Sequence, residues 1–227
     1  MKIIFIVATR LSKESFVSDS ALARSLKIFD SENIVIELYD DNRSGLPTVY
    51  NHAVNNINAS PEDILVFCHD DIGILDFFWI DHLVSGLMHF DVVGLAGNRR
   101  RLKMQPSWLF DDLTLTTFDV PSLSGIVAHG KNLRPEKLSV YGPPNQEVEL
   151  LDGLFLATSM QTIRHHGLNF DERFNFDFYD LDFCRQVRSK NLKLGTVPLS
   201  VIHESEGNFN TDSWRLAYLA YIDKWKD

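Results

Sequence analysis

The sequence predicts an α/β fold: a single domain with a mostly parallel central sheet flanked by helices. Two observations support this class. Short apolar runs typical of buried strands alternate with segments whose apolar residues recur at helical spacing, and this alternation favours parallel strands joined by right-handed crossovers. The chain has 227 residues, 44% of them hydrophobic and 23% charged, and an α/β domain of this length can fold as one unit.

The alternation is clearest in the first part of the chain. The predicted strands are Ile3 to Ala8, Ile34 to Tyr39, Ile64 to Cys68 and Val92 to Ala96. Between them, the spacing of apolar residues predicts helices from Ser18 onward, from Pro47 onward and from Phe78 to Phe90.

The alternation stops after Gly97. A basic cluster and the apolar run Trp108 to Phe110 are followed by scattered proline and glycine up to Pro144, and we expect a long excursion that carries a hairpin and a lid. Regular structure then returns at Val148 to Ala157, in a helix from Tyr179 to Lys190, in a strand-like run from Val197 to Ile202 and in a C-terminal helix with an aromatic face, Trp214 to Trp225, capped by Thr211 or Asp212.

Charge and cysteine content narrow the class of protein. The formal net charge of -9 argues against a nucleic-acid partner, because phosphate backbones are bound by basic surfaces. Cys68 and Cys184 are too few for a disulfide framework, and we expect both to be buried free thiols. The chain shows neither a signal-peptide pattern nor the ~20 consecutive apolar residues of a membrane span, so the sequence predicts a cytoplasmic protein.

In two segments far apart in the sequence, acidic residues or a histidine come at the end of an apolar run. CHDDIG, residues 68–73, places Asp70 and Asp71 directly after a strand-like run. FDFYDLDF through VIHESEG, residues 176–207, supplies Asp177, Asp180, Asp182 and then His203 at the end of another run. Ligands of open α/β sheets bind at the carboxyl ends of the strands. Carboxylates and imidazole at this edge therefore predict a divalent metal and a charged substrate.

The order of these segments resembles family 2-type glycosyltransferases with the Rossmann-like GT-A fold, in the small branch that carries H-x-D in place of D-x-D. The segments that carry the resemblance are DNRSGLPTVYNHAV (41–54), FCHDDIGI (67–74), LLDGLFLAT (150–158), FDERFNFDFYDLDFCRQVR (170–188) and VIHESEGNF (201–209). The resemblance implies a nucleotide-binding half, residues 1–97, and an acceptor-binding half, residues 98–227, that contains the helix of the catalytic base and the C-terminal helix.

The resemblance also implies a metal-dependent enzyme, inverting in mechanism, that moves a sugar from a nucleotide-sugar donor to a hydroxyl acceptor. Asp71, His69 and His203 would hold Mn²⁺ or Mg²⁺, and the imidazole ligands favour Mn²⁺. Asp180 matches the catalytic base of the family, which takes the proton of the acceptor hydroxyl. Tyr179 stands where the family has a glutamate.

A further group of residues is assigned by the resemblance to the nucleotide and the sugar. Its members are Thr9, Arg10, Asp40, Asp41, Asn51, Asp70, Asp152 and Arg185. Thr9 and Arg10 would contact the base through the backbone, and Asp40 or Asp41 would hydrogen-bond it. Asn51 would lie near the ribose and Asp152 next to the sugar or acceptor. Arg185 flanks Gln186, close to where the family often has an arginine. UDP- or GDP-sugars are the expected donors, and a glycan or glycolipid of surface-polysaccharide or lipopolysaccharide synthesis is the expected acceptor.

Simpler interpretations stay open for each element taken alone. Asp70, Asp71, Asp180 and Asp182 are also typical of turns and helix caps. The basic cluster, Arg99 to Lys103, fits either a solvated loop or a contact to an anion. Trp108 to Phe110 fit closure over the acceptor, contact with a membrane surface or packing of the loop against the core. The aromatic C-terminal helix fits core packing, peripheral contact with a membrane or a dimer interface.

Two other functions also remain as alternatives. One is a GT-A-like domain that binds nucleotide or glycan without turnover, because His69 and Tyr179 replace acids. The other is a nucleotidyltransferase, which is disfavoured because residues 8–15 contain no glycine.

Overall fold

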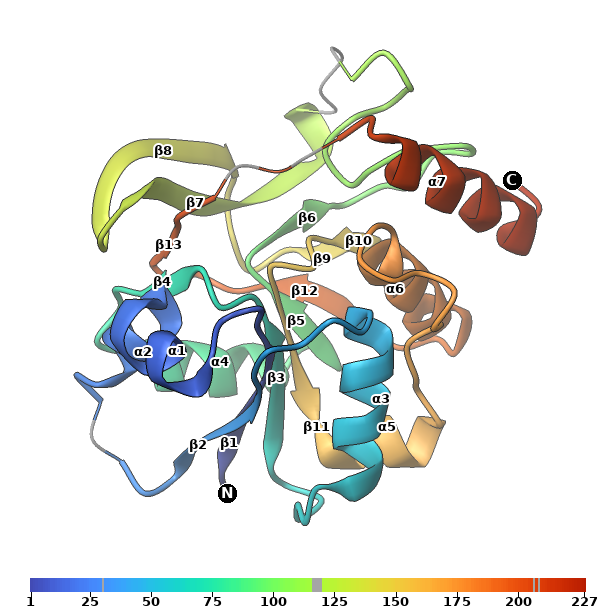
Figure 1. The fold of residues 1–227 in the computed structure, drawn as a ribbon. Coiled ribbons are helices and arrows are strands. Elements are labelled where there is room, and N and C mark those ends of the chain that lie inside the picture. Colours follow the sequence, from blue (N-terminus) through green and yellow to red (C-terminus); the bar gives the residue numbers. More distant parts are fainter. Residues whose placement is uncertain (30, 116–119, 206, 208) are drawn as a thin grey trace.

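The computed structural model describes residues 1–29, 31–115, 120–205, 207 and 209–227. In these residues, one sheet of seven strands forms the core of an α/β fold (Figure 1). Its strand order is β2 (Ile34–Tyr39), β1 (Ile3–Ala8), β3 (Ile64–Cys68), β11 (Phe155–Ser159), β5 (Val92–Gly94), β12 (Leu194–Thr196) and β9 (Glu147–Val148). The α/β class predicted from the sequence is confirmed.

The core sheet is parallel at one end and mixed beyond it. β1 pairs in parallel with β2 and with β3. All five residues of β3 are buried, as expected for a strand that is covered on both faces. β11 is antiparallel to both β3 and β5, which the prediction of a mostly parallel sheet did not include. The reason is that the chain enters β11 from a second sheet at the carboxyl edge of β3, without a crossover helix.

The second sheet lies across that edge. Its strand order in the described residues is β10 (Leu150–Leu151), β6 (Ala96–Asn98), β7 (Leu123–Lys131), β13 (Val201–His203) and β4 (Ile72–Ile74), and β8 (Arg134–Gly142) pairs with β7. The predicted strand Val92 to Ala96 is divided between the two sheets at Leu95. The excursion after Gly97 contains the predicted hairpin, β7–β8, preceded by a 3-10 turn at Val120–Ser122.

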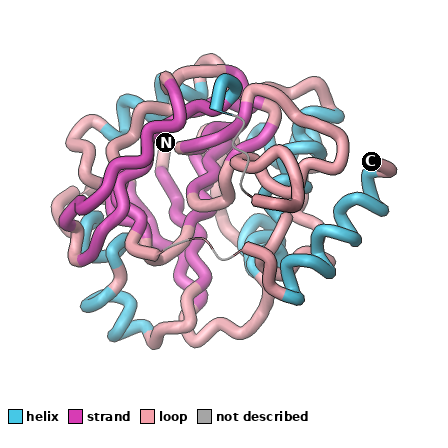
Figure 2. The backbone as a smooth tube through the Cα atoms, turned by 90° about the horizontal axis from the view of Figure 1, so that it is seen from above, coloured by secondary structure: helices cyan, strands magenta, loops and turns pink. Residues whose placement is uncertain are grey.

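Helices pack around the sheets (Figures 1 and 2). They are α1 (Lys13–Asp19), α2 (Ala21–Leu26), α3 (Leu46–Asn56), α4 (Trp79–Leu87), α5 (Met160–His166), α6 (Tyr179–Ser189) and α7 (Asp212–Trp225). The helix predicted from Ser18 onward is α2, which begins at Ala21, and the short helix before it, α1, was not predicted. The two helices are separated at Ser20, which has an extended backbone and accepts a hydrogen bond from the Ala23 amide at 3.1 Å, so that it caps α2.

The aromatic face of α7 belongs to the core. Trp214, Tyr218 and Tyr221 are buried, and their rings lie 5.2, 5.8 and 5.3 Å from the ring of Phe178. This packing favours the core interpretation of that face over membrane contact. No helix in the described part of the chain combines the length and hydrophobicity that crossing a bilayer requires. Cys68 and Cys184 are buried free thiols, as predicted.

Candidate active site

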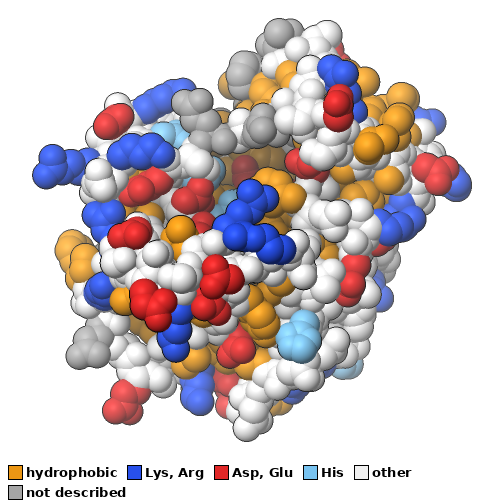
Figure 3. All heavy atoms as spheres, in the orientation of Figure 1, with side chains coloured by type: hydrophobic (Ala, Val, Ile, Leu, Met, Phe, Trp, Pro, Cys, Tyr) orange, Lys and Arg blue, Asp and Glu red, His pale blue; other side chains and the backbone are white. Residues whose placement is uncertain are grey.

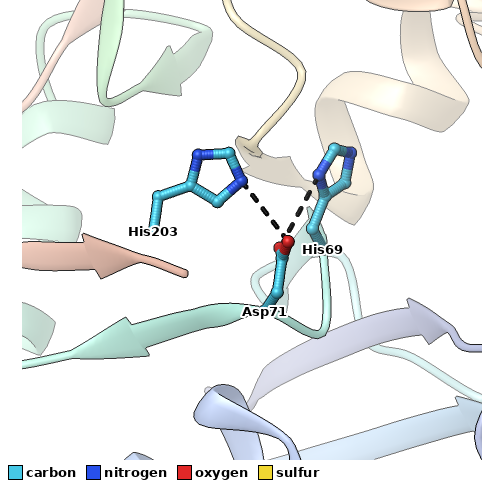
Figure 4. Close-up of side chains that lie close together, drawn as sticks. All are labelled: His69, Asp71 and His203. Atoms are coloured by element: carbon cyan, nitrogen blue, oxygen red, sulfur yellow. Dashed lines mark ion pairs between the residues drawn. The ribbon is translucent and has the colours of Figure 1, made fainter. Parts of the chain in front are cut away.

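Strand pairing between distant segments brings a histidine next to an aspartate. His69 and Asp71 occupy the turn between β3 and β4. β13 runs antiparallel to β4, and this pairing sets His203 opposite Ile72. His69 and His203 lie on either side of the Asp71 carboxylate (Figure 4). One ligand atom from each of the three side chains lies within 4.8 Å of the others.

Asp71 is the ionised centre of this cluster. Its Oδ2 lies 3.5 Å from Nε2 of His203, and its Oδ1 lies 4.0 Å from Nδ1 of His69. Burial alone would raise the pKa of Asp71, but the contact with His203 and the charge of that histidine hold the pKa well below its usual range. For His203, burial lowers the pKa and the Asp71 carboxylate raises it, with a net increase. Burial lowers the pKa of His69, which favours its neutral imidazole.

The protonated nitrogen of His69 follows from its hydrogen bonds. The Tyr179 hydroxyl donates its one proton to the Gly153 carbonyl at 2.8 Å, and its oxygen also lies 3.3 Å from Nε2 of His69. The Tyr179 oxygen must therefore accept the second hydrogen bond, which places the His69 proton on Nε2. Nδ1 keeps its lone pair and faces Asp71, so it is available as a metal ligand.

The donor set fits a transition-metal cation. Oδ1 of Asp71 is buried and has no hydrogen-bond partner among the described residues, an unsatisfied position that a bound cation would fill. Two imidazole nitrogens and one carboxylate suit Mn²⁺ and similar ions, whereas Mg²⁺ prefers oxygen ligands. His69, Asp71 and His203 are the residues predicted as metal ligands, and the structure brings them together.

Asp180 lies near this cluster at the start of α6. Phe178, the residue before α6, has a left-handed backbone with φ 67°. The Asp180 carboxylate accepts hydrogen bonds from the amides of Gly153 and Leu181 at 2.9 and 2.8 Å. Burial raises the pKa of Asp180 to about 7, the charge of Asp152 contributes to the increase, and the two amides oppose it. A carboxylate with this pKa can accept a proton near neutral pH.

Gly153 allows the close approach of these groups. A Cβ atom at this position would lie 2.7 Å from Cζ of Tyr179 and 2.9 Å from Cβ of Asp180. A larger residue would therefore displace both side chains. Neither the role of Gly153 nor the contact of Tyr179 with His69 was predicted from the sequence. The signals that could have indicated them were the Asp152-Gly153 pair and the Tyr179-Asp180 pair.

Asp152 lies next to this group and is held from two directions. It accepts hydrogen bonds from the Leu154 amide and from Nε1 of Trp108, each at 2.8 Å. Asn98 in turn donates to the Trp108 carbonyl at 2.9 Å, which fixes the loop that carries Trp108. Trp108 is buried, so it pins the loop to the core, one of the three roles considered from the sequence.

The residues predicted to bind the nucleotide base meet at the carboxyl ends of β1, β2 and β3. The Thr9 hydroxyl donates to Oδ2 of Asp70, and the Asp41 amide donates to the Leu11 carbonyl at 2.9 Å. Asp40, Asp41 and Arg10 are exposed beside them. Figure 3 shows a hollow in the upper half of this view, with acidic, basic and histidine side chains around it.

Asn51 and Arg185 are engaged elsewhere. The Asn51 side chain exchanges hydrogen bonds with the backbone of Phe170, at 2.8 and 2.9 Å. The Arg185 guanidinium binds the Asp227 carboxylate at 2.6 and 3.0 Å and lies over the Trp225 ring. Both side chains join elements of the fold, and this arrangement does not favour the nucleotide-binding roles predicted for them.

The basic cluster after Gly97 forms ion pairs. Arg100 lies 3.3 Å from Asp111, and Arg101 lies 3.2 Å from Asp227. Arg99 and Arg100 line a surface hollow together with Glu147 and Glu149, both of which bind Arg188. These pairs favour the structural interpretation of the cluster over a free anion site.

Comparison with known proteins identifies the enzyme class. The model of a family described as "Glycosyltransferase like family" matches residues 15–214. The chain belongs to this glycosyltransferase-like family. The family match covers most of the chain, and the resemblance inferred from its motifs is confirmed. No curated protein sequence matches the chain significantly.

Solved structures show that this glycosyltransferase has the GT-A fold. A197 from STIV aligns with a TM-score of 0.54 at 14% identity, over 91% of this chain and 87% of its own. Residues 1–349 of TarS from S. aureus align with a TM-score of 0.50 at 13% identity, over 90% of this chain and 60% of that one. GalNAc-T7, solved with UDP, GalNAc and Mn²⁺, aligns with a TM-score of 0.55 at 8% identity, over 98% of this chain and 48% of its own. The chain thus spans 60% of the TarS fragment and 48% of GalNAc-T7.

Proposed function

We propose that this glycosyltransferase is metal-dependent and inverting, and that it moves a sugar from a nucleoside diphosphate sugar to a hydroxyl group of a glycan or glycolipid. One observation carries the proposal: two consecutive residues, Tyr179 and Asp180, link the proposed metal ligands to the proposed catalytic base. Tyr179 contacts His69 through its hydroxyl, and the next residue presents a carboxylate with a pKa of about 7. Base and metal ligands are thus held in one framework.

In the proposed reaction, Asp180 accepts the proton of the acceptor hydroxyl as the oxygen attacks the anomeric carbon. The amides of Gly153 and Leu181 hold the carboxylate in place during the attack. A single displacement with the base opposite the leaving group inverts the anomeric configuration. A cation bound by the cluster supplies Lewis-acid stabilisation of the charge that develops on the leaving diphosphate.

The donor would lie along the carboxyl ends of β1, β2 and β3. Thr9 and Asp70 are already joined there, and Arg10, Asp40 and Asp41 are exposed to a ligand. UDP is the first nucleotide to test, because GalNAc-T7 was solved with UDP and Mn²⁺ and its fold matches 98% of this chain. The acceptor class, and a place in surface-glycan or lipopolysaccharide synthesis, rest on family analogy.

A binding panel tests the proposal. We would record thermal unfolding with UDP, GDP, CDP, ADP and dTDP, each with and without Mn²⁺, for the wild type and for Asp71→Asn. A nucleotide at 100 times its Kd stabilises by about 2.7 kcal/mol, which for this chain length raises Tm by roughly 5–10 °C.

We expect one nucleotide to raise Tm only with Mn²⁺, and Asp71→Asn to remove the shift. Unchanged midpoints in the wild type for every nucleotide would contradict the proposal. A metal-dependent shift without transfer to any acceptor in a saccharide panel would instead support a binding domain without turnover.

A further inference from the structure

Phe176 is an exposed aromatic residue beside the metal-ligand cluster. Its side chain is 59% exposed. Its ring stacks on the imidazole of His69, with centroids 5.6 Å apart and planes inclined by 27°. One face of the ring therefore covers a predicted metal ligand, and much of the rest of the side chain is open to solvent.

The segment around Phe176 is held in place on both sides. The Asn175 carbonyl accepts a hydrogen bond from the Leu46 amide at 2.8 Å, which fixes the segment to the start of α3. A Cβ atom at Gly45 would lie 2.7 Å from Oδ1 of Asn175, so glycine is needed for this contact. On the other side, Ser213 donates to Asp177 at 3.3 Å. Phe176 thus projects from an anchored backbone.

The rest of the segment is directed inward, toward packing or catalysis. Phe178 is buried against α7, Tyr179 contacts His69, and Asp180 accepts a hydrogen bond from the Gly153 amide. Phe176 lies four residues before the proposed base and against a proposed metal ligand. The open face of Phe176 therefore lies beside His69, whose Nε2 contacts Tyr179, the residue directly before the proposed base.

Aromatic rings bind sugars through their electron-rich faces. The face of a phenyl ring carries negative charge density, and the C–H groups on one side of a pyranose are weakly positive and apolar. A neighbouring carboxylate then accepts hydrogen bonds from the sugar hydroxyls. Asp177 is partly exposed and follows Phe176 directly in the chain, which suits it to this role.

We infer that Phe176 is a substrate-positioning residue, on whose open face the pyranose ring of the donor or of the acceptor stacks. This inference rests on the proposed function and adds the contact that orients the reacting sugar. It predicts that removing the ring weakens sugar binding without weakening nucleotide or metal binding.

The test compares Phe176→Ala with Phe176→Tyr, which keeps the aromatic face, and with Phe77→Ala, which removes an aromatic side chain that is 78% exposed elsewhere on the surface. With Mn²⁺ present, we would measure Kd for UDP and for UDP-GalNAc, with GDP and GDP-mannose as a second pair. We would also measure KM for methyl hexosides as acceptors. Ligand-observed NMR of the same methyl hexosides would report sugar binding without any nucleotide.

If the donor sugar stacks on Phe176, Phe176→Ala should weaken the binding of the nucleotide sugar about 5- to 10-fold and leave the nucleotide Kd unchanged. An acceptor sugar predicts a similar rise in KM for the hexoside and loss of its NMR signal. Phe176→Tyr and Phe77→Ala should match the wild type in both cases.

The inference is overturned if Phe176→Ala stays within twofold of the wild type in all sugar measurements. Failure of the proposed function looks different, because the wild type itself would then bind no nucleotide with Mn²⁺. The hexoside NMR comparison still decides the inference in that event.

Discussion

The Tyr179 hydroxyl lies 3.3 Å from Nε2 of His69 and donates to the Gly153 carbonyl at 2.8 Å. Tyr179 thus links the helix that carries Asp180 to the cluster that contains Asp71. It occupies the position where the resemblance to family 2-type enzymes leads us to expect a glutamate. In this chain, a neutral phenol at that position supports a histidine ligand by fixing which nitrogen carries the proton.

Tyr179→Phe should therefore weaken metal binding. Without the phenol oxygen, Nε2 of His69 loses its hydrogen-bond acceptor, and the orientation of Nδ1 toward Asp71 is no longer fixed. Loss of such outer-sphere contacts typically costs 10- to 100-fold in metal affinity. Mn²⁺ affinity measured by calorimetry checks this expectation. Tyr218→Phe is the matched control, because it removes a hydroxyl that donates to the Met104 carbonyl at 2.9 Å. Equal Mn²⁺ affinity in both variants would contradict the role of Tyr179.

The two neighbouring aspartates should differ in their effect on the metal. Asp71 contacts both histidines, whereas Asp70 accepts a hydrogen bond from the Thr9 hydroxyl. We expect Asp71→Asn to abolish Mn²⁺ binding and Asp70→Asn to retain it, because only Asp71 supplies the charged oxygen between the imidazoles. Mn²⁺ titration followed by electron paramagnetic resonance distinguishes the variants. Equal loss in both would show that the turn as a whole holds the ion.

Asp180→Asn should lose transfer but keep nucleotide binding. The amide is close in shape to the carboxylate but cannot accept the acceptor proton, and general-base catalysis typically contributes about 10²–10⁴-fold. We expect kcat to fall by that factor, with the Kd for nucleotide and Mn²⁺ within about threefold of the wild type. In the wild type, kcat should rise with pH up to about 7, as Asp180 ionises, and then level off. Unchanged kcat in Asp180→Asn would remove this residue from the mechanism.

The same carboxyl group should make stability depend on pH. Folding raises the pKa of Asp180 from 3.8 to about 7, so the folded state favours the protonated form. The resulting loss of folding stability is absent below pH 4, grows between pH 4 and 7 and is constant above pH 7. The stability of Asp180→Asn relative to the wild type should therefore increase across this window, by up to about 4 kcal/mol. Urea unfolding in EDTA at pH 4.5, 6 and 8 measures the difference. A pH-independent difference would show that the pKa is not raised.

The sequence predicted the first three strands well, and β1, β2 and β3 have the predicted bounds. β1 and β3 are almost wholly buried, so each appears as one continuous apolar run, whereas β2 is a half-buried edge strand that contains Glu37. The run Val92 to Ala96 is also continuous, yet it is divided between two sheets. Nothing local marks that division, since both halves are buried and only the pairing partners differ.

The site was predictable as a set of residue types but not as a set of contacts. Asp71 and His203 were identified by their place at strand ends and His69 by the resemblance to the family, and the structure gathers all three. The ion pair of Arg185 depends on Asp227, which follows it by 42 residues and comes after α7 in the sequence. The orientation of Tyr179 depends on the left-handed backbone of Phe178 and on the missing Cβ of Gly153. Such long-range contacts and backbone angles leave no periodic signal.

A buried ion pair should make the C-terminal helix essential for stability. Nζ of Lys224 lies 2.7 Å from Oδ1 of Asp182 and 2.7 Å from Oδ2 of Asp171. The Asp182 side chain is 0% exposed, and its other described donor is Nε1 of Trp225 at 2.8 Å. Lys224→Met leaves this carboxylate buried without its cation. The expected loss in the free energy of unfolding is about 2–3 kcal/mol. This lies at or below the usual range for a broken buried pair, because Lys224 is partly exposed.

Lys226→Met is the matched control on the same helix end. Lys226 pairs with Asp223 at 3.3 Å, but the two side chains are 81% and 82% exposed. A pair this exposed contributes little, so we expect a change below about 0.5 kcal/mol. Urea unfolding at pH 7 compares the two variants. Similar losses in both would mean that the buried pair does not hold α7 against α6. A large loss in Lys224→Met alone would show that it does, and that Asp182, two residues from the proposed base, serves the fold.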